Sequence, residues 1–236
     1  MHDYKQDEAR LTFYKTHPEQ CDPDDLWGQV MRTVNGKPVP EEQINLIIEF
    51  VVRSLNLHKE DVLLDLCCGN GALTDRLFNF CAGGVGIDFS EPLISIANKK
   101  FHKENQRDYF LSDIEDFLNK ENTCHQYTKA ICYGSFMYLT EKKALNVLKL
   151  LCEKFTGVEK FLIGNLPDKN KIETFAKNRG VEKIIADDPA EPFGIWRTKR
   201  EFSKMANMAG WNVTFSEMPE NFYSAGYRYD ALLIRQ

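Results

Sequence analysis

Short apolar runs alternate with helix-length amphipathic segments along the chain after residue 60. Each run has the length of a buried strand, and in chain order the runs are 62–66, 84–87, 109–111, 129–133 and 158–164. Strands that are apolar on both faces and separated by helices are typical of a parallel sheet covered by helices on each side. The pattern therefore predicts an α/β, Rossmann-like, doubly wound fold.

The spacing of apolar residues changes near the C-terminus. Residues 211–217 and 228–235 each alternate with a period of two, and the loop between them is too short for a crossover helix. We therefore expect these two strands to pair as an antiparallel hairpin. Their loop would then lie over the carboxyl ends of the parallel strands, where ligands bind in such folds.

Two segments fall outside this alternation. Residues 1–39 precede a helix that opens at Pro40, and residues 166–197 contain a helix ending at Gly180 followed by a loop. We expect residues 1–39 to form a helical lid or extension. Residues 40–236 would form one domain that carries the second segment as an insertion.

Composition and charge narrow the classes of partner. The chain has 236 residues, with 30 Lys and Arg against 35 Asp and Glu, so its net charge of −5 opposes nonspecific binding to nucleic acid. No apolar run approaches the roughly 20 residues that span a bilayer, and the N-terminus lacks the apolar core of a secretory signal. Seven cysteines without a CxxC pair indicate neither a disulfide framework nor a zinc site. We expect a cytoplasmic protein without a metal, a membrane partner or a nucleic-acid partner, and the sequence indicates no oligomeric state.

Residues 62–74, VLLDLCCGNGALT, read as a strand, a glycine turn and the start of a helix. Glycines at 69 and 71 would let the backbone approach a ligand and expose N–H groups at the helix start. Asp88 ends the second strand, 17 residues after Gly71, where a carboxylate can accept from two ribose hydroxyls. Asp113 ends the third strand, where it could accept from an adenine amino group. The alternative is that both acids only cap the helices that follow them.

At these motifs the chain resembles the class I S-adenosylmethionine-dependent methyltransferases. The resemblance runs from about residue 40 to the end, and it rests on DLCCGNG, GIDFS, the acid at 113, CYGSF and the terminal strand pair. It departs at Cys67, where the family motif has its first glycine. We expect the cysteine to forbid the most strained backbone conformation there and to leave cofactor binding intact.

The resemblance implies a seven-stranded sheet with an antiparallel last strand and bound S-adenosylmethionine. Asp65 would lie near the methionine amino group, Asp88 would hold the ribose, and Tyr133 would lie beside the sulfonium. Asp113 and the Ile114 amide would read the adenine edge. The other implied cofactor contacts are Cys67, Gly69, Asn70, Gly71 and Phe89.

Two other functions remain open. A nicotinamide-dependent dehydrogenase shares the strand, glycine turn and distant acid, but its third glycine is replaced here by Thr74 and its fold lacks a terminal hairpin. A noncatalytic subunit could bind S-adenosylmethionine in the same pocket to regulate a partner. Turnover by the pure chain would separate this second possibility from an enzyme.

The fourth strand ends in CYGSF, at residues 132–136, beside the expected acceptor. This is not the motif of enzymes that methylate base nitrogens, and it lacks the carboxylate of metal-dependent catechol-type enzymes. We therefore expect methyl transfer to an O or N atom of a small molecule. Residues 27–38 resemble methyltransferases found among bacterial surface-polysaccharide genes, which implies a sugar or polysaccharide precursor as one acceptor class.

Aromatic residues beside cations mark the extension, the insertion and the hairpin loop. Together with a tyrosine after the fourth strand, they give the candidate acceptor contacts Tyr14, Trp27, Arg32, Tyr138, Trp196, Arg197, Tyr223 and Arg228. An equally weighted alternative is that Trp27 and Trp196 only anchor their segments. We expect the extension and insertion to form a lid, and removal of the N-terminal 35 residues to impair turnover while leaving the cofactor bound.

His17 is the candidate general base, because His58 and His125 precede strands and so lie at the far edge of the sheet. A base is needed only if the acceptor carries a proton at neutral pH. The alternative is an acceptor that is already nucleophilic, such as an amine or an anionic oxygen.

Overall fold

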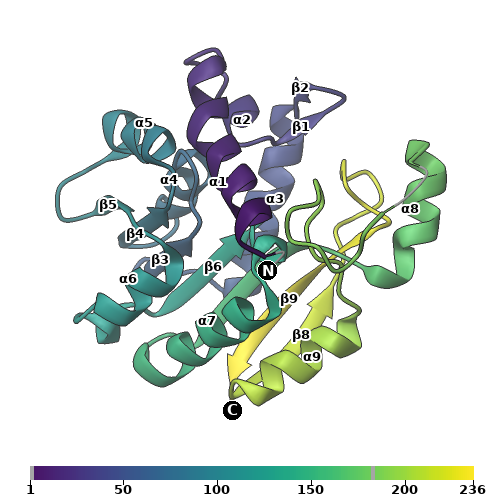
Figure 1. Cartoon of the computed structure of the whole chain (residues 1–236). Coiled ribbons are helices and arrows are strands. Elements are labelled where there is room, and N and C mark those ends of the chain that lie inside the picture. The colour runs from purple at the N-terminus through teal and green to yellow at the C-terminus, as the bar shows by residue number, and fades with distance from the viewer. Residues whose placement is uncertain (1–2, 182–183) are drawn as a thin grey trace.

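The computed structural model describes residues 3–181 and 184–236, and it contains a seven-stranded sheet between two layers of helices (Figure 1). The strands of this sheet, in chain order, are β3 Val62–Leu66, β4 Gly83–Asp88, β5 Arg107–Leu111, β6 Lys129–Tyr133, β7 Lys160–Pro167, β8 Trp211–Ser216 and β9 Arg228–Arg235. Their order across the sheet is β5-β4-β3-β6-β7-β9-β8, and β9 is antiparallel to both of its neighbours. The predicted fold class is confirmed.

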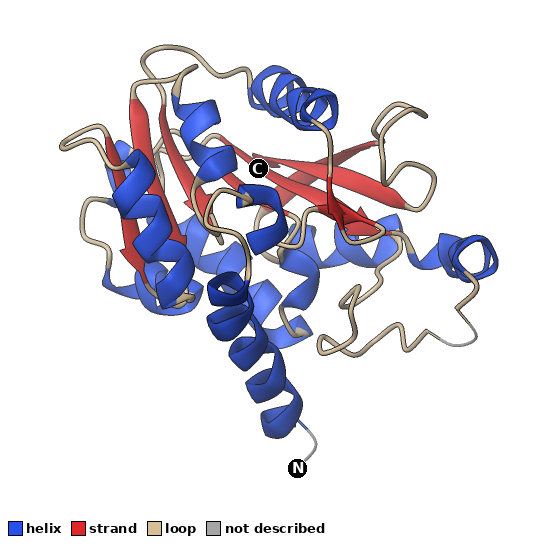
Figure 2. Cartoon of the chain, turned by 90° about the horizontal axis from the view of Figure 1, so that it is seen from above, coloured by secondary structure: helices blue, strands red, loops and turns tan. Residues whose placement is uncertain are grey.

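Helices cover both faces of the sheet, as the view from above shows (Figure 2). One face is covered by α3 Glu41–Leu55, α4 Ala72–Phe78 and α5 Glu91–Phe101. The other is covered by α6 Ile114–Lys120, α7 Glu141–Lys154 and α9 Lys199–Met208. Because each central strand is buried on two faces, its sequence is apolar at successive positions, and every residue of β6 is buried.

The parallel register brings several strand ends to one edge. Leu66 of β3 lies opposite Ile87 of β4, and Asp65 lies opposite both Gly86 and Ile131. The loops after these strands therefore meet above the same edge of the sheet. The strand predicted at 158–164 begins two residues later and runs on to Pro167, because its last residues pair with the start of β9.

The turn after β3 differs from our expectation in one respect. Cys67 has a φ of 69°, so the expectation that the cysteine forbids a strained backbone is wrong. The left-handed conformation costs a residue with a side chain about 1–2 kcal/mol. Neighbouring contacts hold it in place: Cys68 N donates to the Ile87 carbonyl at 2.8 Å, and Gly69 N donates to Asp88 Oδ2 at 2.9 Å.

The N-terminal extension lies over the carboxyl edge of the sheet (Figure 1). It consists of α1 Asp3–Gln20, α2 Leu26–Gln29 and a small hairpin of β1 Thr33–Val34 and β2 Lys37–Pro38. Ser90 Oγ, at the start of α5, donates to the Tyr14 carbonyl at 2.6 Å and ties α1 to the domain. The division of the chain at residue 39 stays a prediction.

The insertion after β7 contains α8 Ile172–Arg179, which ends at Gly180 in the left-handed conformation, as predicted. Figure 1 shows α8 at the margin of the fold, beside the loop that joins β8 to β9. Among the described helices, none has both the length and the apolar character needed to cross a membrane.

Candidate active site

A small cavity of about 270 Å³ lies where β3, β4, β5 and β6 end. We call it the small cavity. Most of the predicted site residues line it: Tyr14, Trp27, Arg32, Asp65, Cys67, Gly69, Asn70, Asp88, Phe89, Asp113, Ile114, Tyr133 and Tyr138. Gly71 is not in its wall but caps α4 with a φ of 76°, and a Cβ there would lie 2.9 Å from the Tyr109 ring.

Asp88 is buried at the end of β4 and organises two backbone segments. Its Oδ2 accepts from Gly69 N and its Oδ1 accepts from Ser90 N, both at 2.9 Å. Burial raises its pKa to about 6, although these hydrogen bonds oppose the shift. A carboxylate has about four lone-pair sites, so Asp88 can still accept from a ligand hydroxyl.

Asp65 is a second buried acid, at the centre of the small cavity. Burial raises its pKa to about 7, while the hydrogen bond from Thr74 Oγ1 at 2.6 Å and the charge of Arg32 lower it. The Nε and Nη1 atoms of Arg32 are buried without a hydrogen-bond partner in the described part of the chain. A carboxylate and a guanidinium therefore face the same small space, and neither forms an ion pair among the described residues.

Asp113 caps a helix, as the alternative predicted, and also lines the small cavity. Its Oδ1 accepts from Glu115 N at 2.9 Å and so caps α6, and its Oδ2 pairs with Lys143 Nζ at 2.6 Å. Lys143, on α7, also lines the small cavity, and the sequence analysis missed it. If Asp113 contacts a ligand, its carboxylate does so while it also accepts from Glu115 N and pairs with Lys143.

The extension closes the small cavity over the glycine turn. Asn70 Nδ2 donates to the Leu26 carbonyl at 2.7 Å and to Gln29 Oε1 at 2.8 Å. The Val30 side chain lies over Gly69, where a Cβ would approach Val30 Cγ1 to 2.9 Å. Residues of the extension are thus part of the wall.

A large cavity of about 820 Å³ adjoins the small one. It lies between the extension, the insertion and the β8–β9 loop. The two cavities share the wall residues Tyr14, Val30, Arg32, Gly134 and Tyr138. Tyr223 and Arg228, predicted as acceptor contacts, line the large cavity, and so does Asn165, which we had not predicted.

The comparisons with known proteins agree with this geometry. A family model for a methyltransferase domain matches residues 63–153. A probable cobalt-precorrin-6B C(15)-methyltransferase (decarboxylating) of Methanococcus maripaludis is 28% identical over 61% of this chain and 72% of that protein. An uncharacterized methyltransferase of Schizosaccharomyces pombe is 36% identical over 33% of this chain, and the match spans 28% of that protein.

The fold is shared with solved structures of methyltransferases. The crystal structure of magnesium protoporphyrin IX methyltransferase from Synechocystis PCC 6803 with bound S-adenosylmethionine superposes with a TM-score of 0.64 and 13% identity, covering 100% of both chains. These findings confirm the predicted resemblance to the class I S-adenosylmethionine-dependent methyltransferases. The predicted enzyme class and cofactor are confirmed.

The small cavity of this methyltransferase fits S-adenosylmethionine, which supplies an electrophilic methyl group when bound. Asp88 is placed to accept from ribose hydroxyls, and the buried Asp65 would gain a partner in the cofactor ammonium. Arg32 Nε and Nη1, which lack hydrogen-bond partners among the described residues, would gain one in the cofactor carboxylate. The individual residue roles stay predictions.

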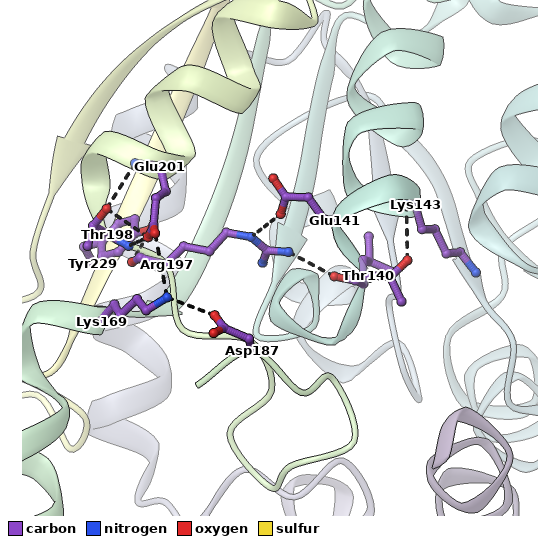
Figure 3. A network of polar contacts seen from close by, with 10 residues as sticks. Thr140, Glu141, Lys143, Lys169, Asp187, Arg197, Thr198, Glu201 and Tyr229 are labelled. Atoms are coloured by element: carbon purple, nitrogen blue, oxygen red, sulfur yellow. Dashed lines mark hydrogen bonds and ion pairs between the residues drawn. The ribbon is translucent and has the colours of Figure 1, made fainter. Parts of the chain in front are cut away.

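Trp196 and Arg197 are not acceptor contacts, which corrects our prediction. Trp196 is fully buried, and its ring lies 5.3 Å from that of Phe175 in the insertion and 6.3 Å from that of Tyr227 in the β8–β9 loop, so it anchors the insertion to that loop. Arg197 is directed at the N-terminus of α7, where its Nε pairs with Glu141 at 3.2 Å and its Nη2 donates to the Leu139 carbonyl (Figure 3). Neither residue lines either of the two cavities.

His17 also lies outside both cavities. Its Nε2 is 3.0 Å from the Gly28 carbonyl, so this nitrogen carries the proton and donates, and its ring stacks on Phe13. The structure therefore does not support His17 as the general base. His17 could reach the cavities only from the side of α1 that faces them. The sequence does not determine which side of α1 faces the cavities.

Buried acids make the stability of the cofactor-free protein depend on pH. The pKa values of Asp65 and Asp230 are raised to about 7 and that of Asp88 to about 6, chiefly by burial. The folded chain therefore binds more protons than the unfolded chain between about pH 4 and 7, and its free energy of unfolding falls as pH rises through this window. We expect Asp65→Asn to be more stable than wild type at pH 8, by about 1–3 kcal/mol, and to lose this advantage at pH 4. Urea titrations at both pH values measure the difference, and a variant less stable at pH 8 would contradict the burial argument.

Proposed function

We propose that this methyltransferase transfers a methyl group to an oxygen or nitrogen atom of a small molecule that binds in the large cavity. The observation that carries the proposal is the shared wall of the two cavities, which places an acceptor beside the cofactor. A volume of about 820 Å³ lies within the range of small-molecule sites. Two proteins that the chain resembles are named for small-molecule acceptors, magnesium protoporphyrin IX and cobalt-precorrin-6B.

The walls of the large cavity favour an anionic or amphipathic acceptor over a neutral sugar. Six aromatic residues line it, namely Phe13, Tyr14, Tyr138, Phe193, Tyr223 and Tyr227. Its charged wall residues in the described chain are Arg32 and Arg228. Aromatic rings exclude water and offer apolar area, while guanidinium groups bind oxyanions.

The rival functions have less support. A regulatory subunit that only bound S-adenosylmethionine would need no second cavity beside the small one. A nicotinamide-dependent dehydrogenase is not favoured, because the sheet ends in an antiparallel hairpin and the family model is that of a methyltransferase domain.

The protein's own contribution to the reaction is to align the acceptor and to exclude water. Methyl transfer is an in-line displacement, so orientation supplies much of the acceleration. Among the described wall residues of the large cavity there is no His, Asp or Glu that could remove a proton from an acceptor. The geometry therefore favours an acceptor that is nucleophilic without a base.

His17→Ala tests this point. We expect the variant to keep the wild-type turnover to within about twofold at every pH from 6 to 9, because His17 lies outside both cavities. Initial rates with the same acceptor measure it. A loss of turnover at constant cofactor affinity would restore His17 as the base.

The experiment that tests the proposed function uses S-adenosylmethionine with a labelled methyl group. The pure protein is incubated with small-molecule and macromolecular fractions of a cell extract, and mass spectrometry identifies what gains a methyl group. We expect label in the small-molecule fraction with wild type and, at a limiting concentration of S-adenosylmethionine, much less label with Asp88→Ala. Label in nucleic acid or protein alone would reject a small-molecule acceptor, and cofactor binding without any transfer would favour the regulatory subunit.

A further inference from the structure

Asn165 lies at a break in the sheet beside the proposed reaction site. The pairing of β7 with β9 shifts register between Ile163 and Leu166, and Asn165, in this bulge, has a φ of 65°. Bulges of this kind redirect a side chain next to an active site, and Asn adopts the left-handed conformation more readily than other residues with a side chain.

The Asn165 amide faces the wall shared by the two cavities. A Cβ at Gly134 would lie 3.8 Å from Asn165 Nδ2 and 3.9 Å from Arg32 Nη2. Ser224 Oγ donates to Asn165 Oδ1 at 3.0 Å, and this contact orients the amide so that its donor group is the one left for the cavity. The backbone of Asn165 is held as well, because its N–H donates to Asp230 Oδ1 at 2.8 Å.

Arg228 completes the arrangement from the start of β9. Its Nη1 donates to the Asn165 carbonyl, its guanidinium lies over the Tyr227 ring at 5.2 Å, and its Nε is buried without a hydrogen-bond partner in the described chain. The hydroxyl of Tyr133 is likewise buried and unpartnered there. Burial raises the pKa of Tyr133 well above its ordinary value, so this hydroxyl is a donor at neutral pH.

Two buried donor groups here have no hydrogen-bond partner in the described chain, and the buried Asp230 carboxylate, which accepts from Asn165 N, lies close to them. The acceptor oxygens of Asn165 already receive hydrogen bonds from Ser224 and Arg228, whereas the Arg228 Nε and the Tyr133 hydroxyl lack partners. Buried donors without partners are costly, and a ligand with negative oxygens would satisfy them. No Asp or Glu side chain lines the large cavity in the described residues.

We infer that the acceptor is an organic carboxylate with an aromatic or other apolar body, that Asn165 and Arg228 hold its carboxylate, and that the product is its methyl ester. The inference rests on the proposed function. A carboxylate oxygen forms the new C–O bond as the methyl C–S bond breaks, the electron pair of that bond stays on sulfur, and no proton is transferred. One carboxylate can meet both Asn165 and Arg228 and keep a lone pair for the reaction, because its two oxygens offer about four lone-pair sites.

The cavity selects against the other acceptor classes. A protonated amine would be repelled by Arg32 and Arg228, and a hydroxyl would need a base that the described wall does not supply. A carboxylate is already ionised at neutral pH. Its reaction neutralises opposite charges, and this is favoured in the aromatic, water-excluding surroundings of the large cavity.

The chemical stability of the product tests the inference directly. Labelled methyl esters release labelled methanol in mild alkali, whereas N-methyl groups and methyl ethers keep their label. We expect the small-molecule label transferred by wild type to be alkali-labile. Alkali-stable label would overturn the carboxylate inference and leave the proposed function standing, whereas the absence of any transferred label would reject the proposed function itself.

Asn165→Asp keeps the shape of the side chain. Asp, like Asn, also tolerates the left-handed backbone conformation at this position. It replaces the amide donor by a negative oxygen, and we expect it to remove the alkali-labile product while calorimetric affinity for S-adenosylmethionine stays within about twofold. Arg200→Gln, which removes a positive charge from an exposed position on α9, should change neither quantity. An Asn165→Asp protein that retains full ester formation would refute the role of the amide.

A binding measurement without cofactor gives a second readout. We expect 3-phenylpropionate to bind the wild-type protein about 10- to 150-fold more tightly than neutral 3-phenylpropanamide, because its charge meets the unpartnered donors. Arg228→Gln should reduce that preference to near unity. Equal binding of the two probes to wild type, measured by ligand-observed NMR titration, would contradict an oxyanion site.

Discussion

Replacing Asp88 by alanine is expected to weaken S-adenosylmethionine binding by about 10- to 150-fold, the loss of one or two hydrogen bonds to a charged group. Asp88 is buried at the end of β4, faces the small cavity and orders the glycine turn through Gly69 N. The substitution therefore removes a ligand contact and loosens the turn at the same time. Isothermal calorimetry measures the affinity.

The control for this prediction is Asp116→Ala. Asp116 is an exposed acid on α6 that pairs only with Lys120 among the described ion pairs, so its loss removes the same charge far from the cavity wall. We expect its affinity to match wild type. An Asp88→Ala protein that unfolds cooperatively and binds the cofactor normally would remove Asp88 from the cofactor site.

Removing the N-terminal 35 residues is expected to abolish turnover and also to weaken cofactor binding at least about tenfold, since buried polar and apolar contacts are lost together. The second part revises our expectation from the sequence, which left the cofactor bound. Trp27, Val30 and Arg32 line the small cavity, and Asn70 in the glycine turn donates to α2. The extension therefore lines the small cavity, where we expect the cofactor, as well as the large cavity.

A shorter deletion provides the comparison. Removing residues 1–11 leaves every described wall residue of both cavities in place, and it should preserve both affinity and turnover. Far-ultraviolet circular dichroism checks that the longer deletion folds. Should that folded protein bind S-adenosylmethionine with wild-type affinity, the extension would act on the acceptor alone.

Arg32→Gln tests whether the Arg32 guanidinium binds the carboxylate of the cofactor or that of the acceptor. We expect it to lower cofactor affinity about tenfold, because Arg32 lies close enough to Asp65 to lower its pKa and therefore beside the expected methionine portion. The effect on cofactor affinity distinguishes Arg32 from Arg228, whose substitution should affect the acceptor alone. Unchanged cofactor affinity would return Arg32 to the acceptor contacts.

The sequence alone determined the features that depend on local periodicity and chain order. Apolar runs separated by helical segments predicted the strands, and the short loop after 217 required the antiparallel pair. Asp88 was found because it ends a strand next to the glycine turn, and parallel strands end at one edge. Such inferences succeed because burial on two faces imposes a pattern on consecutive residues.

Only the tertiary structure decided which way isolated side chains point. Trp196 and Arg197 resembled lid residues in the sequence, but Trp196 packs between the insertion and the β8–β9 loop and Arg197 binds the start of α7. His17 turns toward the Gly28 carbonyl. Asn165 interrupts an apolar strand by a single polar residue, a signal that by itself marks neither a bulge nor a cavity. The register shift and the contact from Ser224, 59 residues away, place its amide beside Gly134, and contacts between such distant positions leave no period in the sequence.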